Sequence, residues 1–288
     1  MASFRWVALA SVTLLALLSV GVLGSQAHAS TGIAPTPGAP TRIILASALD
    51  GFISGHSHDR YVANRLYNNP STYVVLDATH RQLPPGWHAK TAMLFTSYSG
   101  PTGFQAAVQQ HTLLPGISAV IYNNEAEKGW LTPKSETDRP DRYAARFAKL
   151  AHLSKLTDIN ASGDIHTLFK ADAKYADVLV MQIQGSESDH NLFDQLLAQA
   201  TAEARHQSAS VELVAEITSN PRKLCPERRS LSCATADRAT AARDIVSNRH
   251  HIAGFWVWVY TDVPALANAG MENADGILEQ LSAQWPAA

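Results

Sequence analysis

The sequence predicts a single domain over residues 41–288, built as a closed barrel of eight parallel β-strands alternating with α-helices, a (β/α)8 or TIM barrel. Three observations support this prediction. Eight short apolar and β-branched runs recur along the chain, segments of helical periodicity lie between several of them, and the region is long enough for one such domain. Strands that alternate with helices form parallel sheets through right-handed crossovers, and eight such units in roughly 250 residues close a barrel.

The expected strands are the eight apolar runs, at residues 42–48, 72–77, 91–97, 118–123, 157–160, 178–184, 212–218 and 252–260. Two of the intervening helices carry clear signals. Residues 141–153 follow Pro140 with alanines and leucines at helical spacing, and residues 192–206 repeat that pattern. An open doubly wound sheet is the alternative. That fold carries a glycine-rich phosphate-binding turn after an early strand, which the first two runs lack.

The first 29 residues predict a signal peptide. Arg5 gives a positive start, an apolar run covers residues 6–23, and Ala27-His28-Ala29 has the small-x-small pattern of a cleavage site. A retained membrane anchor is the alternative. Residues 30–40 are rich in Pro, Ser, Thr and Gly and predict a flexible leader. No later run reaches the roughly twenty apolar residues of a membrane span. We therefore expect a secreted, extracytoplasmic protein without a stable membrane span after cleavage.

The composition limits the classes of partner. Hydrophobic residues make up 46% of the chain and charged residues 17%, which allows a sizeable core. The net charge is −2, and the charges are scattered along the sequence. Nucleic acids and anionic membranes require basic patches, so we expect no nucleic-acid partner. We expect a monomer.

The two cysteines, Cys225 and Cys233, predict a disulfide that closes one loop. Exported proteins form disulfides readily, whereas a metal site would need more ligands than Glu227, the only other candidate ligand in residues 224–234.

Polar side chains recur where the expected strands end. Asp77 ends the second strand, and Asn123, Asn124 and Glu125 follow one another at the end of the fourth. The active sites of (β/α)8 barrels lie at this end of the strands. These residues are therefore candidates for binding or catalysis.

Gln182 and Gln184 lie two residues apart on the sixth strand, so their amides share one face. Buried amides require hydrogen-bond partners. Either a ligand or an internal polar layer of the barrel can supply these partners, and the sequence leaves both interpretations open.

Two glutamates are the candidate catalytic residues. Glu125 follows the fourth strand directly, and Glu216 shares a face of the seventh strand with Val214 and Thr218. A surface glutamate is the alternative for Glu125, and a structural carboxylate is the alternative for Glu216. Glycoside hydrolysis uses two carboxylates, about 5 Å apart when configuration is retained and about 7–9 Å apart when it is inverted.

Trp256, Trp258 and Tyr260 alternate along the eighth strand and therefore share one face. We expect Trp256 to belong to the core. Trp258 and Tyr260 are closer to the strand end, where flat rings can stack on a sugar. They are the candidate glycan platform.

Other chemistries have weaker support. The sequence contains neither a Gly-x-Ser-x-Gly elbow nor a His-Glu-x-x-His motif. Asp77 with the loop of His56 and His58 is the candidate for a metal-dependent hydrolase. The residues imply no cofactor.

With these residues the chain resembles secreted (β/α)8 glycoside hydrolases. Asn124-Glu125, Glu216 and the tryptophan of the eighth strand look like the retaining superfamily that ends strand four in Asn-Glu and strand seven in Glu. This resemblance implies that Glu125 is the acid/base, Glu216 the nucleophile, and Asn124 a ligand of the sugar 2-hydroxyl.

Residues 118–125 also resemble the chitinase-like barrels, which end strand four in Asp-x-x-Asp-x-Asp-x-Glu. In that register Glu125 is the acid, and Ser118, Ile121 and Asn123 replace all three aspartates. An asparagine can hold an N-acetyl group but cannot supply charge. Residues 122–133 look like part of a group of secreted bacterial barrel proteins without a settled activity. The expected function is therefore a glycoside hydrolase acting on a polysaccharide or oligosaccharide. The alternative is a catalytically inactive barrel that binds glycan.

Overall fold

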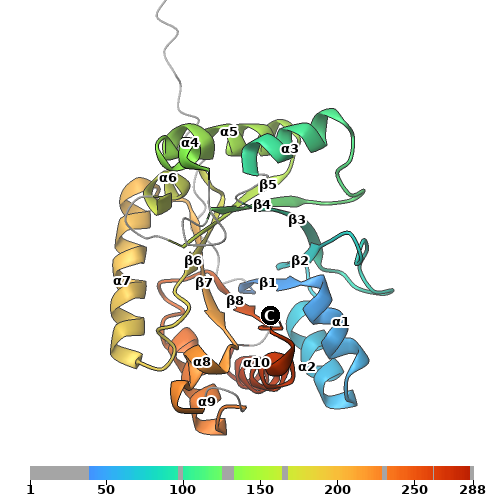
Figure 1. Ribbon diagram of the computed structural model, residues 1–288, viewed down its shortest axis with the longest axis vertical. Helices are drawn as coiled ribbons and strands as arrows, with labels where there is room; N and C mark the ends of the chain where they lie inside the picture. Colours follow the sequence, from blue (N-terminus) through green and yellow to red (C-terminus); the bar gives the residue numbers. More distant parts are fainter. Residues whose placement is uncertain are drawn as a thin grey trace, which may run out of the picture. The chain divides into compact units, whose positions relative to one another are not determined.

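Eight parallel strands close into a barrel in the computed structural model, which describes residues 39–96, 100–124, 133–163, 168–228, 232–261 and 263–285. Each strand pairs with its neighbours in sequence, and β8 pairs with β1 to complete the ring (Figure 1). This confirms the predicted (β/α)8 barrel. The strands are β1 (Thr41–Leu45), β2 (Thr72–Leu76), β3 (Lys90–Thr96), β4 (Ala119–Asn124), β5 (Thr157–Ser162), β6 (Val178–Gln182), β7 (Glu212–Thr218) and β8 (Gly254–Trp258).

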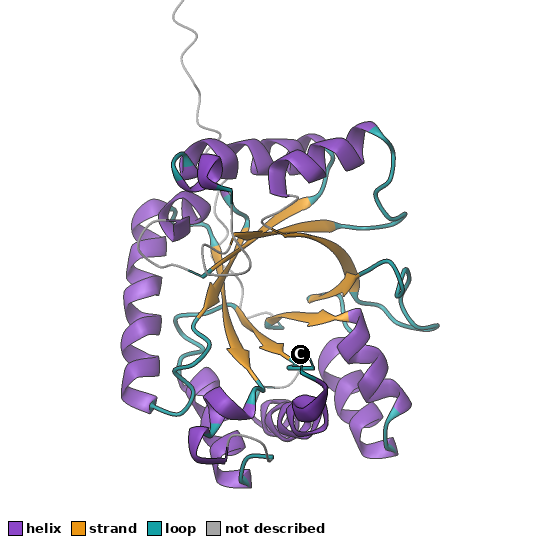
Figure 2. Ribbon diagram, in the orientation of Figure 1, coloured by secondary structure: helices purple, strands orange, loops and turns teal. Residues whose placement is uncertain are grey.

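Helices surround the strands on the outside of the ring (Figure 2). They are α1 (Ala46–Ser54), α2 (Ser57–Tyr67), α3 (Gly100–Gln109), α4 (Lys134–Thr137), α5 (Pro140–Leu153), α6 (Leu168–Tyr175), α7 (His190–Gln207), α8 (Pro221–Leu224), a 3₁₀ turn η1 (Pro226–Arg228), α9 (Thr235–Ser247) and α10 (Pro264–Gln284). No described helix combines the length and the apolar composition that crossing a bilayer requires.

All eight predicted strands are present, and the differences lie at their ends. The first expected strand continued to residue 48, but β1 ends at Leu45 and α1 begins at once at Ala46. Both predicted helices are confirmed as α5 and α7. Pro140 stands at the first turn of α5, and Asp189 caps α7 by accepting the Leu192 N–H at 3.1 Å.

The connection from β2 to β3 differs from the regular pattern, because residues 77–89 contain no helix. Pro84 and Pro85 each lack a backbone N–H, and Gly86 has a φ of +81°. Prolines and a left-handed glycine do not continue a helix. This crossover is therefore an extended loop.

Alternate side chains of the strands fill the interior of the barrel. This inner cluster contains Ile43, Tyr73, Val75, Ala92, Ala119, Ile121, Ile159, Ala161, Val178, Val180, Val214 and Trp256. Trp256 is 2% exposed, so its predicted place in the core is confirmed. Side chains alternate along a strand, so Thr96, Asn123, Gln182, Glu216 and Trp258 continue the inward-facing set toward the carboxyl ends of their strands.

A polar layer is buried on the outer side of the barrel, between β4, β5 and α6. Asn124, Asp158, Ser162 and Asp172 are each at most 2% exposed. Burial raises the pKa of Asp172 to about 8, although hydrogen bonds from Ser162 and Asn124 oppose this. Burial also raises the pKa of Asp158, and the nearby carboxylates of Asp177 and Asp172 raise it further. At neutral pH the folded protein therefore retains the proton of Asp172.

At the amino-terminal end of the barrel, Arg42 joins the first strand to the end of the last helix. Its side chain is fully buried, its Nη2 donates to the Trp285 carbonyl at 3.0 Å, and its guanidinium lies 5.6 Å from the Phe255 ring centroid. Burial lowers the pKa of Arg42 to about 10.

The predicted disulfide is confirmed, with Cys225 and Cys233 joined and their Cα atoms 5.7 Å apart. Cys233 also donates its N–H to Asn273 Oδ1 at 2.7 Å, and Asn273 Nδ2 donates to the Ser219 carbonyl at 3.1 Å. The disulfide and these bonds attach the loop after β7 to α10.

Replacing both cysteines by alanine is expected to lower the free energy of unfolding by about 2 kcal/mol. The reason is that the short closed ring restricts the unfolded chain. Urea denaturation without reductant measures the loss, and reductant should destabilise the parent protein but not the variant. Equal stability of the two oxidised proteins would contradict this expectation.

Candidate functional site

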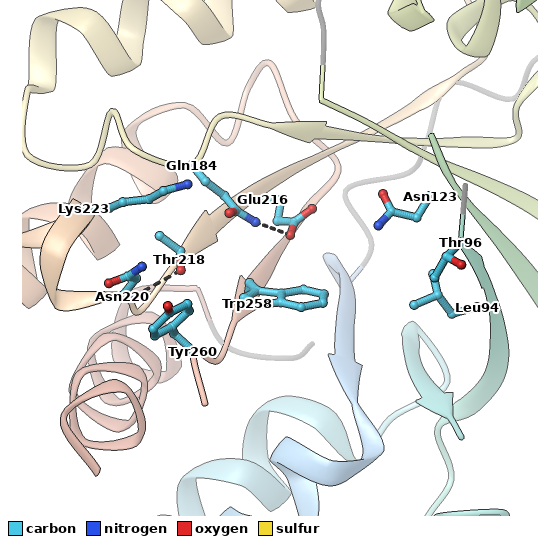
Figure 3. A pocket seen from close by; sticks show the side chains of 10 residues that line it. All are labelled: Leu94, Thr96, Asn123, Gln184, Glu216, Thr218, Asn220, Lys223, Trp258 and Tyr260. Carbon is cyan, nitrogen blue, oxygen red and sulfur yellow. Dashed lines mark hydrogen bonds between the residues drawn. The ribbon is translucent and has the colours of Figure 1, made fainter. Parts of the chain in front are cut away.

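A cavity of about 320 Å³ opens at the carboxyl ends of the strands (Figure 3). Its described lining comes from β3, β4, β7, β8 and the segments that follow β6, β7 and β8. The lining residues are Leu94, Thr96, Asn123, Gln184, Glu216, Thr218, Asn220, Lys223, Trp258 and Tyr260. This is the end of the barrel at which the sequence places binding and catalytic residues.

Glu216 is the carboxylate of this cavity and is only 1% exposed. Its Oε1 accepts a hydrogen bond from Gln184 Nε2 at 2.5 Å (Figure 3). On the neighbouring strands, Gln182 and Trp256 stand in register with it. A carboxylate held by an amide at the base of a concave site can act on a bound ligand as a nucleophile, a base or an electrostatic stabiliser.

The amides of β4 and β6 contact each other inside the barrel. Gln182 Nε2 donates to Asn123 Oδ1 at 3.2 Å, across the intervening strand β5. Gln184 lines the cavity instead and binds Glu216. The sequence left open whether Gln182 and Gln184 form an internal polar layer or face a ligand. In the structure, Gln182 belongs to an internal polar layer, and Gln184 faces the cavity.

The aromatic rings of β8 form one wall of the cavity. Trp258 and Tyr260 line it and are partly exposed. Trp256 lies beneath, with its ring centroid 5.6 Å from that of Trp258 and an interplanar angle of 48°. The buried ring supports the exposed one, so Trp258 presents a fixed flat surface to the cavity.

A buried glutamate in the β6–α7 loop anchors the segments on either side of Glu216. Glu187 is 2% exposed, and its carboxylate accepts the Gly185 N–H at 2.5 Å and the Thr218 N–H at 2.7 Å. Burial raises its pKa, although these backbone hydrogen bonds and the charge of Lys223 oppose the shift. The carboxylate thereby fixes the loop of Gln184 to the end of β7.

Two further predicted site residues, Asn124 and Asp77, lie elsewhere. Asn124 faces outward, away from the inner cluster that includes Ile121, on the side of Asp172. Asp77 follows β2 and pairs with His80, whose Nδ1 is 3.0 Å from Asp77 Oδ2. Neither lines the described cavity. Glu125 lies outside the described residues.

The candidate metal ligands Asp77, His56 and His58 make separate contacts in the structure. His56 immediately precedes α2 as its N-cap, and His58 Nε2 lies 3.6 Å from Glu279 on α10, whereas Asp77 pairs with His80. Within the described ranges, the only three potential ligands whose donor atoms lie within 4.8 Å of one another belong to Cys225, Cys233 and Asp237. The two sulfurs of that group are joined in the disulfide.

Five lining residues were absent from the predicted site, namely Leu94, Thr96, Thr218, Asn220 and Lys223. Thr96 ends β3 on the inward face, and strand alternation could have identified it. Asn220 precedes Pro221, a signal for the start of a helix, and its Oδ1 accepts the Arg222 N–H at 3.0 Å. Lys223 carries no local sequence signal, because its place in the cavity depends on how α8 packs.

No protein-family model matches the chain, and no curated protein sequence matches it. Solved structures that are similar to it include the catalytic core of xylanase A, with 10% identity, a TM-score of 0.49, and 85% of this chain and 98% of that chain covered. A Rhizomucor miehei β-1,3-glucanosyltransferase mutant in complex with laminaritriose has 13% identity, a TM-score of 0.47 and coverages of 78% and 88%. Triosephosphate isomerase from Bartonella henselae has 12% identity, a TM-score of 0.43 and coverages of 82% and 98%. At these identities and TM-scores, no functional conclusion follows from them.

Proposed function

We propose that this protein binds a glycan in the cavity and cleaves its glycosidic bonds, with Glu125 as general acid/base and Glu216 as the second carboxylate. The observation that carries the proposal is the placement of the buried Glu216 carboxylate in a concave site walled by Trp258 and Tyr260. Aromatic faces bind the C–H groups of a sugar, and a carboxylate beside the sugar stabilises the positive charge that develops on it.

The proposed mechanism gives each of these side chains a role in binding or cleaving the glycan. Trp258 and Tyr260 stack on the sugar, and Asn123 offers an amide to its hydroxyl groups. Gln184 holds Glu216 so that it can attack the anomeric carbon or activate water. Glu125 protonates the leaving oxygen. The sequence of residues 1–29 and the disulfide support action outside the cytoplasm, after cleavage of a signal peptide.

A catalytically inactive glycan-binding barrel is the second candidate. The residue that replaces the last aspartate of the chitinase-like pattern, Asn123, accepts a hydrogen bond from Gln182. Among the described residues, Glu216 is the one carboxylate that lines the cavity. Binding of a glycan through the aromatic wall would not require a charge on Glu216.

Trp258→Ala is expected to weaken glycan binding at least about tenfold, because it removes the larger ring of the platform. Trp258→Phe, which keeps a ring, should lose less. Tyr61→Ala is the matched control, since Tyr61 is 60% exposed and does not line the cavity. Calorimetric titration against a panel of bacterial, fungal and plant oligosaccharides measures the affinities.

A turnover assay separates the glycoside hydrolase from the inactive glycan-binding barrel. It compares the wild type with Glu125→Gln on aryl glycosides and polysaccharides. Cleavage that Glu125→Gln abolishes supports the enzyme. Binding that depends on Trp258, without turnover on any substrate, leaves the inactive barrel. Absence of both binding and turnover would overturn the proposal.

A further inference from the structure

Lys223 is the one cation among the described residues that line the cavity, and it stands on a segment directly after β7. Lys223 belongs to α8, whose first turn is capped by Asn220 and begins with Pro221. The Lys223 N–H donates to the Asn220 carbonyl at 2.9 Å, and the neighbouring Leu224 is 2% exposed. The disulfide at Cys225 follows immediately. The backbone that carries this lysine is therefore fixed relative to the barrel.

The side chain of Lys223 points from α8 toward Gln184 at one end of the cavity, whereas Asn123, Thr96 and Leu94 lie at the other (Figure 3). Its stem runs beside Gly185, where a β-carbon would lie 3.7 Å from Lys223 Cδ. Glu216 lies between the two ends (Figure 3). The cavity thus places a positive charge at one end, a carboxylate in the middle, and neutral polar groups at the other end.

The charge of Lys223 is not consumed by an ion pair with any carboxylate in the described ranges. None of the ten salt bridges there includes it. Lys223 acts electrostatically on Glu187, and each oxygen of that carboxylate already accepts a backbone N–H group. The ammonium group, with three donors, therefore remains able to bind a ligand.

From this arrangement we infer that the cavity takes an acidic glycan, in which a monoanionic group on one sugar, a carboxylate or a sulfate ester, binds Lys223. The inference rests on the proposed function and specifies its substrate class. A single ammonium group matches a single negative charge, and the carboxylate of Glu216 in the same cavity disfavours a more highly charged ligand. The neutral sugars extend over Trp258 toward Asn123.

Calorimetric titration tests the inference. It compares the affinities for oligogalacturonate and hyaluronan oligosaccharides with those for carboxyl-reduced forms of the same molecules. Reduction removes the charge and keeps the sugars and linkages. We expect the acidic forms to bind more tightly, and Lys223→Gln to weaken that binding about tenfold, as loss of a charge-assisted hydrogen bond does. The same substitution should leave affinity for the reduced forms unchanged. Lys223→Arg should retain the preference for the acidic forms.

Arg222→Gln is the matched control, because Arg222 is an exposed cation on the same helix that does not line the cavity. Equal losses in Lys223→Gln and Arg222→Gln would indicate general attraction by charge and overturn the inference. Dextran sulfate oligosaccharides beside dextran distinguish a sulfate from a carboxylate ligand. If neutral and acidic glycans bind equally and through Trp258, the inference fails while the proposed function stands. If no glycan binds, both fail.

Discussion

Glu216→Gln is expected to lower kcat at least about a thousandfold while leaving the fold and glycan binding intact. The substitution removes the negative charge that the proposed mechanism uses in the transition state, in a buried position where charge has a large effect. It also preserves local packing, since a glutamine carbonyl at this position can accept the hydrogen bond that Gln184 now donates to Glu216 Oε1. Steady-state kinetics on the best substrate of the panel measures the loss.

Glu212→Gln is the matched control for this substitution. Glu212 lies on the same face of β7 but at the opposite end of the strand, where its Oε2 accepts the Thr41 hydroxyl at 3.1 Å. Turnover should be unchanged in that variant. Comparable kcat values for Glu216→Gln and the wild type would exclude Glu216 from the chemistry. Proton NMR of the first product then shows whether the anomeric configuration is retained or inverted, and so whether Glu216 attacks carbon or activates water.

Asp172→Asn is expected to stabilise the protein at pH 8, by an amount that grows with pH. The folded protein binds a proton at Asp172 up to about pH 8, whereas the unfolded chain releases it near the ordinary value of 3.8. Between these values unfolding releases a proton, so the stability of the wild type falls as pH rises, by at most about 1.4 kcal/mol per pH unit. An asparagine does not ionise and avoids this loss.

Urea denaturation of both proteins from pH 5 to pH 8 measures the effect. The gain of Asp172→Asn should be smallest at the acidic end and reach several kcal/mol at pH 8. Asp141→Asn is the control, since Asp141 is exposed at the start of α5. If the free energies of unfolding of the wild type and of Asp172→Asn change in parallel with pH, the pKa of Asp172 is not raised by burial.

The fold was predictable because its determinants are local. Each strand is a short apolar run, and the alternation of inward and outward side chains follows from the period of two residues. That period also placed Glu216 and Trp258 on the inner face, and Gln184 and Tyr260 line the cavity just beyond the strand ends. The β2–β3 loop departs from the pattern for an equally local reason, the Pro84-Pro85-Gly86 sequence.

The site was less predictable because several of its members depend on register and loop packing. Asn123 and Asn124 are adjacent, so only one of them can face the interior, and the pairing of β4 with its neighbours decides that it is Asn123. Lys223 reaches the cavity through the position of α8, which depends on Asn220, the disulfide and α10 together. Nothing in the residues around Lys223 specifies that arrangement in advance.

The hydrogen bond from Arg42 to the Trp285 carbonyl makes the two ends of the folded domain neighbours. A short linker can therefore connect residue 285 to residue 40, and the chain can be reopened in the loop at residues 208–211, which enters β7 from the same end of the barrel. Proteins with adjacent ends tolerate such circular permutation. The permuted chain would keep the carboxyl ends of all eight strands unchanged. The connections at the amino ends of the strands can therefore be altered without changing the cavity. The new chain ends would lie at the amino ends of the strands, away from the cavity at their carboxyl ends.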